Sequence, residues 1–81
     1  MSDRIKELEK LIQDNMDDNT IVLTGNTLFE EIEGWDSMEQ VNLISMIEEF
    51  YHFKFNVGEM TAMSCAKSVG DMTSIIAAKL D

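Results

Sequence analysis

The chain has 81 residues, of which 44% are hydrophobic, and a formal net charge of −10 at pH 7. This length predicts a single domain, residues 1–81, with enough apolar residues for one modest core. The excess of carboxylates repels nucleic acid and anionic membrane surfaces, so we expect neither as a partner.

The first predicted helix follows Ser2, a residue type that commonly caps a helix N-terminus. Its apolar residues share one face at spacings of three and four: Ile5, Leu8, Leu11 and Ile12. An Asp/Asn-rich run over residues 15–19 is typical of a turn and ends the helix. This charged start contains no signal peptide and no membrane span, so we expect a cytoplasmic protein.

A metal site is not expected. Asn15, Asp17 and Asn19 alternate like the start of a calcium-binding loop, but its glycine and glutamate positions hold Thr20 and Asn26. The lone histidine, His52, has neither a second histidine nor a suitably spaced cysteine with which to hold zinc.

A long connection is predicted between this helix and Asp36. Its apolar residues are too numerous for a free linker, and we expect them to pack on the bundle: Ile21, Val22, Leu23, Leu28, Phe29 and Ile32. Residues 21–23 alone could form a strand, but no second β-rich run offers a partner.

A second helix is predicted from Ser37 to Tyr51, with Asp36 as N-cap and Glu39 three residues later. A broad buried face is predicted for the following residues: Met38, Val41, Leu43, Ile44, Met46, Ile47, Phe50 and Tyr51. Ser37 lies in the exposed first turn, where free N–H groups and the helix dipole favour an anionic group such as a phosphate ester.

Ser37 has no evident base of its own. The only histidine, His52, lies fifteen residues further on, about 22 Å away along the same helix. A serine nucleophile needs a base within hydrogen-bond reach, so a hydrolase is excluded. Two interpretations remain at this point: a helix-start serine without function, or a serine that another enzyme modifies.

The remaining elements complete an all-α, four-helix bundle with three longer helices, one short helix and a long first loop. Phe53 and Phe55 are expected to anchor a loop, after which Asn56 caps a short helix through Met63. Ser68 with Asp71 opens the last helix, whose inward residues are Val69, Met72, Ile75, Ile76 and Leu80. Cys65, in an apolar stretch, is expected to be a small buried residue.

One segment resembles the attachment segment of acyl carrier proteins: Gly34-Trp35-Asp36-Ser37-Met38, followed by Val41-Asn42-Leu43-Ile44. The end of the chain resembles the last helix of these proteins, over Ser68–Met72 and Ile75–Leu80. The family pattern is Asp-Ser-Leu, and Met38 is a conservative variant. The resemblance implies that Ser37, flanked by Asp36 and Met38, receives 4′-phosphopantetheine from coenzyme A. A separate Mg²⁺-dependent phosphopantetheinyl transferase would add this arm, which holds acyl groups as thioesters. The chain itself would not be an enzyme.

No lysine or arginine occurs between Lys10 and Lys54, an interval that holds ten carboxylates. These acids could form a solvated face that only aids solubility, or a docking surface for basic patches on partner enzymes. The resemblance implies as partners the transferase and acyl-loading, condensing or acyltransferase enzymes, with a monomeric carrier. The predicted partner-facing residues are Trp35, Glu39, Val41, Glu48 and Glu49. For Trp35 the alternative is an anchor that packs back on the bundle.

Departures from the family bear on the pathway. Carriers of fatty-acid synthesis usually have a small residue at the position of Trp35, a leucine at that of Met38 and an acidic residue at that of Asn42. We therefore expect a dedicated pathway, such as polyketide, nonribosomal peptide or modified-sugar synthesis. The alternatives are a fatty-acid carrier, an aminoacyl or D-alanyl carrier and, from another class, an unmodified acidic helical adaptor.

Overall fold

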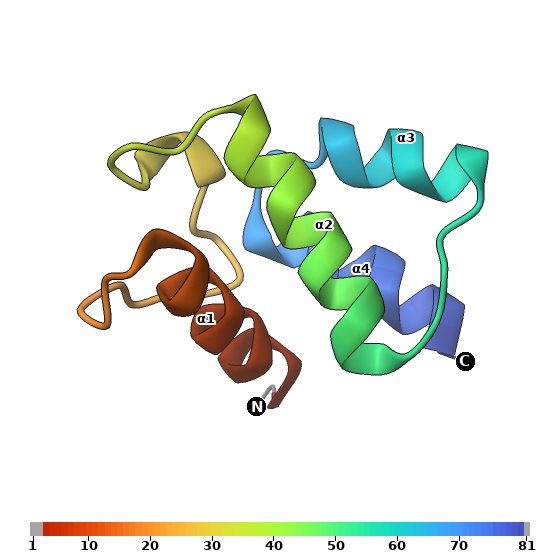
Figure 1. Ribbon diagram of the computed structural model, residues 1–81, viewed down its shortest axis with the longest axis horizontal. Helices are drawn as coiled ribbons and strands as arrows, with labels where there is room; N and C mark the ends of the chain where they lie inside the picture. Colours follow the sequence, from red (N-terminus) through yellow and green to blue (C-terminus); the bar gives the residue numbers. More distant parts are fainter. Residues whose placement is uncertain (1–2, 81) are drawn as a thin grey trace.

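The computed structural model describes residues 3–80, which form four α-helices and one short 3₁₀ helix (Figure 1). The elements in chain order are α1 (Asp3–Met16), η1 (Phe29–Glu31), α2 (Ser37–Tyr51), α3 (Val57–Cys65) and α4 (Val69–Leu80). Within this part of the chain no strand forms, and only an isolated bridge joins Leu28 to Ser68. The all-α class is confirmed, with the short helix and the long first loop where they were predicted. The cap expected at Ser2 lies outside the described residues.

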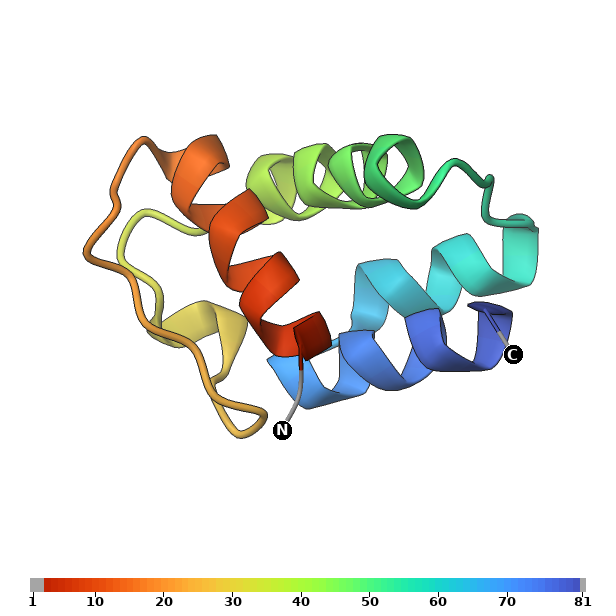
Figure 2. The same cartoon turned by 90° about the horizontal axis from the view of Figure 1, so that it is seen from below.

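The four helices pack in a closed ring around one core. α1 and α3 each pack against both α2 and α4, and Figures 1 and 2 show them at opposite ends of the bundle. Every helix contributes fully buried apolar side chains to the interior, which include Leu8, Ile12, Leu43, Ile47, Met63, Val69, Met72 and Ile76. Because these residues recur at helical spacing, their burial fixes which face of each helix is left for solvent and partners.

The helix ends follow local capping chemistry. The Asp36 carboxylate accepts the backbone N–H of Glu39 at 3.0 Å, and the Ser68 hydroxyl accepts that of Asp71 at 3.1 Å. Asn56 and Glu59 form a reciprocal capping box at the start of α3. These predicted starts are therefore confirmed.

The long first loop is fastened on both sides. The backbone N–H of Leu23 donates to Glu9 of α1 at 2.9 Å, and that of Phe29 donates to the carbonyl of Lys67, just before α4, at 2.9 Å. Leu23, Phe29 and Ile32 are buried, as predicted. The loop is thus part of the bundle, and it delivers the chain to the N-terminus of α2.

Three expectations about burial outside α2 were wrong. Val22 is 76% exposed, because successive side chains of an extended segment point in opposite directions and Leu23 takes the inward one. Leu80 is 43% exposed, because it lies in the last turn of α4 with no element beyond it in the described chain. Cys65 is exposed, because it is the last residue of α3 and lies at a surface groove rather than in the core. In residues 3–80 no helix has the length and apolar character needed to cross a membrane.

Candidate functional site

Ser37 is the first residue of α2 and is exposed to solvent. Asp36, in extended conformation, holds the first turn in place through its bond to Glu39 N–H. The positive end of the helix dipole therefore lies at Ser37, where it favours an anion. A phosphate ester on the Ser37 hydroxyl would be accessible to solvent and would lie in the favourable electrostatic field of the helix N-terminus.

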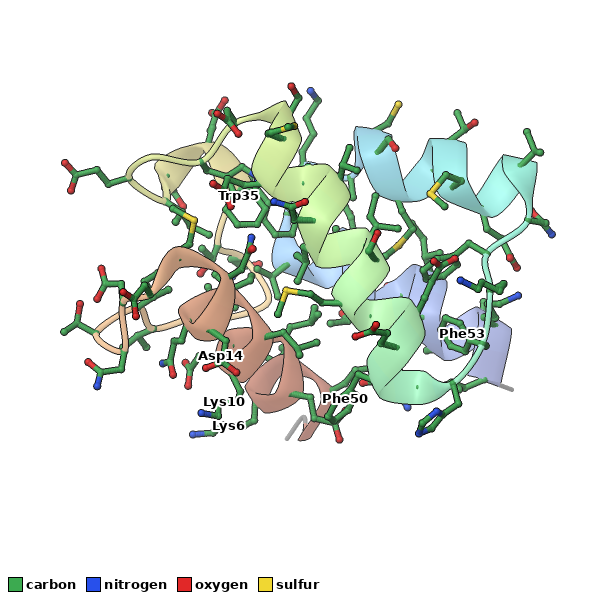
Figure 3. The ribbon with its side chains drawn as sticks, viewed as in Figure 1. Lys6, Lys10, Asp14, Trp35, Phe50 and Phe53 are labelled. Carbon is green, nitrogen blue, oxygen red and sulfur yellow. The ribbon has the colours of Figure 1, made fainter. Side chains whose placement is uncertain are left out.

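Trp35 packs back on the bundle beside Ser37, the second of its two predicted roles. Its ring stacks on Phe29 with centroids 5.2 Å apart and an interplanar angle of 19°. Its indole N–H donates to the side-chain oxygen of Gln40 at 2.9 Å. In Figure 3 the Trp35 side chain lies between the first loop and the start of α2. The stack fixes the loop just before the serine.

Gln40 is a site residue that sequence reasoning missed. It is only 7% exposed, and its amide nitrogen donates to the carbonyls of Met63 at 2.9 Å and Ala66 at 3.3 Å. These carbonyls lie at the C-terminal end of α3, where the last backbone acceptors have few partners, and the Met63 carbonyl also accepts the N–H of Ala66 at 3.3 Å. A signal was present in the sequence, because Gln40 falls three and four residues before the buried Leu43 and Ile44.

A groove of about 690 Å³ opens beside Ser37. Three segments build it: the first loop with η1, the start of α2, and the connection from α3 to α4. Ser37, Asp36 and Gln40 line it, together with Phe29, Trp35, Val41, Cys65, Ala66 and Lys67. Its wall is thus largely apolar and aromatic near the serine. Lys67 is the only basic residue among the lining side chains.

The outer edge of α2 differs from the predicted buried face. Met38 is 68% and Val41 54% exposed, and Phe50 is exposed as well, whereas Leu43 and Ile47 are fully buried. The reason is that α1 and α3 cover only part of the circumference of α2. Met38 and Val41 therefore present apolar surface next to Ser37.

The predicted acidic residues on α2 are not equally free. The Glu39 carboxylate accepts the side-chain amide of Asn15 at 2.8 Å and is half-buried. Glu48 accepts the backbone N–H of Phe55 at 2.8 Å, and its side chain is mostly buried. Glu49 is exposed. Two of the three carboxylates thus stabilise the fold, and their part in partner binding stays a prediction.

Within the described residues, the Ser37 hydroxyl forms no hydrogen bond to a histidine or lysine side chain, although Lys67 lines the same groove. His52, the only histidine in the sequence, is the C-cap of α2, so Ser37 and His52 lie at opposite ends of the same helix. Across the described residues, no cluster of three or more His, Cys, Asp and Glu side chains could hold a metal ion. Ser37 is therefore exposed but not activated as a nucleophile by His52.

No family model and no curated protein matches the sequence. Among solved structures, the chain is similar to the solution structure of a holo acyl carrier protein from Geobacter metallireducens. The two are 34% identical, and the match covers 98% of this chain and 87% of the other with a TM-score of 0.80. The fold and the presented serine define a carrier protein rather than a catalyst. The chain belongs to the acyl carrier protein family.

Proposed function

We propose that Ser37 is the attachment site of a 4′-phosphopantetheine arm and that the chain presents thioester-bound cargo to partner enzymes. The observation that carries the proposal is an exposed serine at the capped N-terminus of α2, beside a groove and without a base of its own. The residues present fit the group, because the helix N-terminus favours its phosphate and the groove offers apolar wall for its chain. When bound, the arm supplies the thiol on which cargo is carried.

The attachment reaction needs a second enzyme. The Ser37 oxygen forms a bond to the phosphorus of the phosphopantetheine moiety while the bond from that phosphorus to the adenosine 3′,5′-bisphosphate of coenzyme A breaks. The serine proton passes to a base on the transferase, which also holds Mg²⁺. This chain contributes the nucleophilic oxygen, the local field of α2 and the position of the loop. It contributes no base, in agreement with the place of His52 at the far end of α2.

The docking surface that we propose combines apolar and acidic residues of α2. Met38 and Val41 supply exposed apolar contact next to Ser37, and Glu49 supplies a free carboxylate. Glu39 and Glu48, although hydrogen-bonded within the chain, add their charge to the same field. The net charge of −10 favours basic patches on the transferase and on acyl-loading, condensing or acyltransferase enzymes. Such electrostatic contacts allow the rapid release that a carrier needs.

We propose a dedicated biosynthetic pathway, with acyl or aminoacyl cargo, rather than primary fatty-acid synthesis. Trp35 supports this choice, because a bulky, packed ring lies two residues before the attachment serine. An unmodified acidic adaptor would present the same α2 surface but would need no arm on Ser37. The modification of Ser37 therefore separates the two functions.

The test is intact mass after incubation with coenzyme A, Mg²⁺ and a broad-specificity phosphopantetheinyl transferase. We expect one phosphopantetheine on the wild-type chain and none on Ser37→Ala, with the same helical circular dichroism for both. Ser45→Ala is the matched control, because Ser45 is also exposed on α2 but lies away from the groove. Loading of Ser37→Ala would refute the site. No loading of a folded, unmodified wild-type chain would favour the adaptor.

A further inference from the structure

The hydrogen bonds around Gln40 close the seam between α2 and α3 at the end where Ser37 lies. Gln40 accepts from the indole of Trp35 and donates to the carbonyls of Met63 and Ala66, so one side chain joins the loop, α2 and α3. We call these three hydrogen bonds, together with the stack of Trp35 on Phe29, the Gln40 clasp. Gln40 lines the groove beside Ser37, and Met63, whose carbonyl accepts from Gln40, is fully buried in the core.

A chain tethered to Ser37 has two places to go. It can lie in the outer groove against Trp35, Val41 and Ala66, or it can pass between α2 and α3 into the core. Entry between α2 and α3 would break the hydrogen bonds between the Gln40 carboxamide and the carbonyls of Met63 and Ala66. The buried carboxamide would then lose these hydrogen bonds and the Ala66 carbonyl its bond from Gln40, whereas the Met63 carbonyl would keep the backbone N–H of Ala66 at 3.3 Å. The loss is costly, because an apolar chain offers no donor or acceptor in place of these groups. The ring stack blocks the route on the side of the first loop.

We infer that the Gln40 clasp is a specificity determinant that keeps cargo on Ser37 out of the helical core. The cargo class that fits is a short or polar acyl or aminoacyl group, which gains little from a deep apolar cavity and rests in the outer groove. A long alkyl chain would stay exposed on this carrier. The inference rests on the proposed attachment at Ser37 and extends it to the choice of cargo.

The experiment loads the protein with butyryl- or octanoyl-coenzyme A by the same transferase and follows the methionine methyl resonances by NMR. Met63 and Met72, both fully buried, report on the core, and the exposed Met38 reports on the surface. In the wild type we expect the Met63 and Met72 signals to be the same with either cargo. In Gln40→Ala we expect octanoyl, but not butyryl, to shift both signals.

Two further variants control the comparison. Gln13→Ala removes another glutamine whose amide donates to a backbone carbonyl, that of Ile21 at 2.8 Å, far from the groove. It should behave as the wild type. Trp35→Phe keeps the ring stack but removes the indole donor, so it should produce the Gln40→Ala shifts to a smaller extent. If Gln40→Ala does not fold, Trp35→Phe still tests whether the Gln40 clasp excludes the octanoyl chain from the core.

The outcomes separate the two levels of the proposal. Octanoyl-dependent shifts of Met63 and Met72 in the wild type would overturn the clasp while leaving the attachment at Ser37 intact. Unshifted signals in both folded clasp variants would show that the hydrogen bonds do not exclude the chain, and would also overturn it. Failure to load any cargo, seen first by intact mass, would refute the proposed function and with it the clasp's role.

Discussion

Tyr51 is the last residue of α2 and connects that helix to α1. Its hydroxyl donates to the Glu7 carboxylate, and its ring stacks on Phe53 with centroids 5.7 Å apart. Burial, then the hydrogen bond to Glu7 and its negative charge, raise the pKa of Tyr51 to about 12, from a usual value near 10. Arg4 opposes this effect in part.

This shift predicts a pH dependence of stability. Because the pKa of Tyr51 is higher in the folded than in the unfolded chain, its contribution is complete below about pH 10 and is lost as the pH rises towards about 12. The free energy of unfolding of the wild type and of Tyr51→Phe should therefore converge over that interval. Tyr51 is the only tyrosine, so tyrosinate absorbance follows it directly, with the urea-unfolded chain as reference. Titration at the same pH in both states would contradict the prediction.

At the scale of a single element, α3 is held at both ends by polar contacts from other helices. At the C-terminus of α3, the Gln40 side chain donates to backbone carbonyls of that helix end. Near the N-terminus of α3, Glu59 forms an ion pair with Lys79 of α4 at 2.9 Å. Lys79 also lies over the Phe53 ring, 5.4 Å from its centroid. A backbone hydrogen bond from Asn56 and the bond to Lys79 hold the pKa of Glu59 below its usual range.

Lys79→Met should loosen α3 selectively. The variant removes the ion pair and the cation–π contact but keeps an apolar stem, so we expect faster amide hydrogen exchange in α3 with little change in α1. The difference from the wild type should shrink as the pH falls through the lowered pKa of Glu59, because protonation removes the charge that Lys79 pairs with.

The matched control is Lys10→Met. Lys10 and Asp14 form an exposed pair at 3.4 Å on the outer face of α1 (Figure 3). Exposed pairs of this kind contribute little, so the control should exchange like the wild type. Equal acceleration in α1 and α3 of Lys79→Met would contradict the selective role of the contact.

At the scale of the whole molecule, the first loop and α4 meet backbone to backbone. The N–H of Gly70 donates to the carbonyl of Gly25 at 2.9 Å. A Cβ at position 70 would lie only 2.7 Å from that carbonyl oxygen, which belongs to the backbone and cannot move aside without moving the loop. The loop that leads to Ser37 therefore depends on the absence of a side chain in α4.

Gly70→Ala should destabilise the protein by about 1–3 kcal/mol, the usual cost of forcing extra volume into a packed contact. Gly58→Ala is the matched control, because Gly58 is the second residue of α3 as Gly70 is of α4. A Cβ at position 58 would contact only the Asn56 side-chain oxygen, at 3.5 Å. This variant should be stabilised by up to about 1 kcal/mol. Urea unfolding midpoints measure both, and a neutral Gly70→Ala would disprove the close contact.

Much of the fold and of the candidate site could be predicted from the chain because the signals are local. Asp36, Asn56 and Ser68 cap backbone groups three residues away, so the helix starts follow from short stretches of sequence. The same locality predicts Ser37 in an exposed first turn, and its distance from His52 along one helix excludes self-activation.

The sequence by itself thus determined the helices, the presented serine and the acidic surface, all of which depend on neighbours in the chain. Only the tertiary structure decided that Trp35 packs inward, that Gln40 is buried, and that Val22 and Cys65 are exposed. The groove likewise exists only where the first loop, α2 and the α3–α4 connection come together. These features depend on contacts between residues far apart in sequence, and hydrophobic periodicity within one helix carries no information about which of its edges another segment will cover.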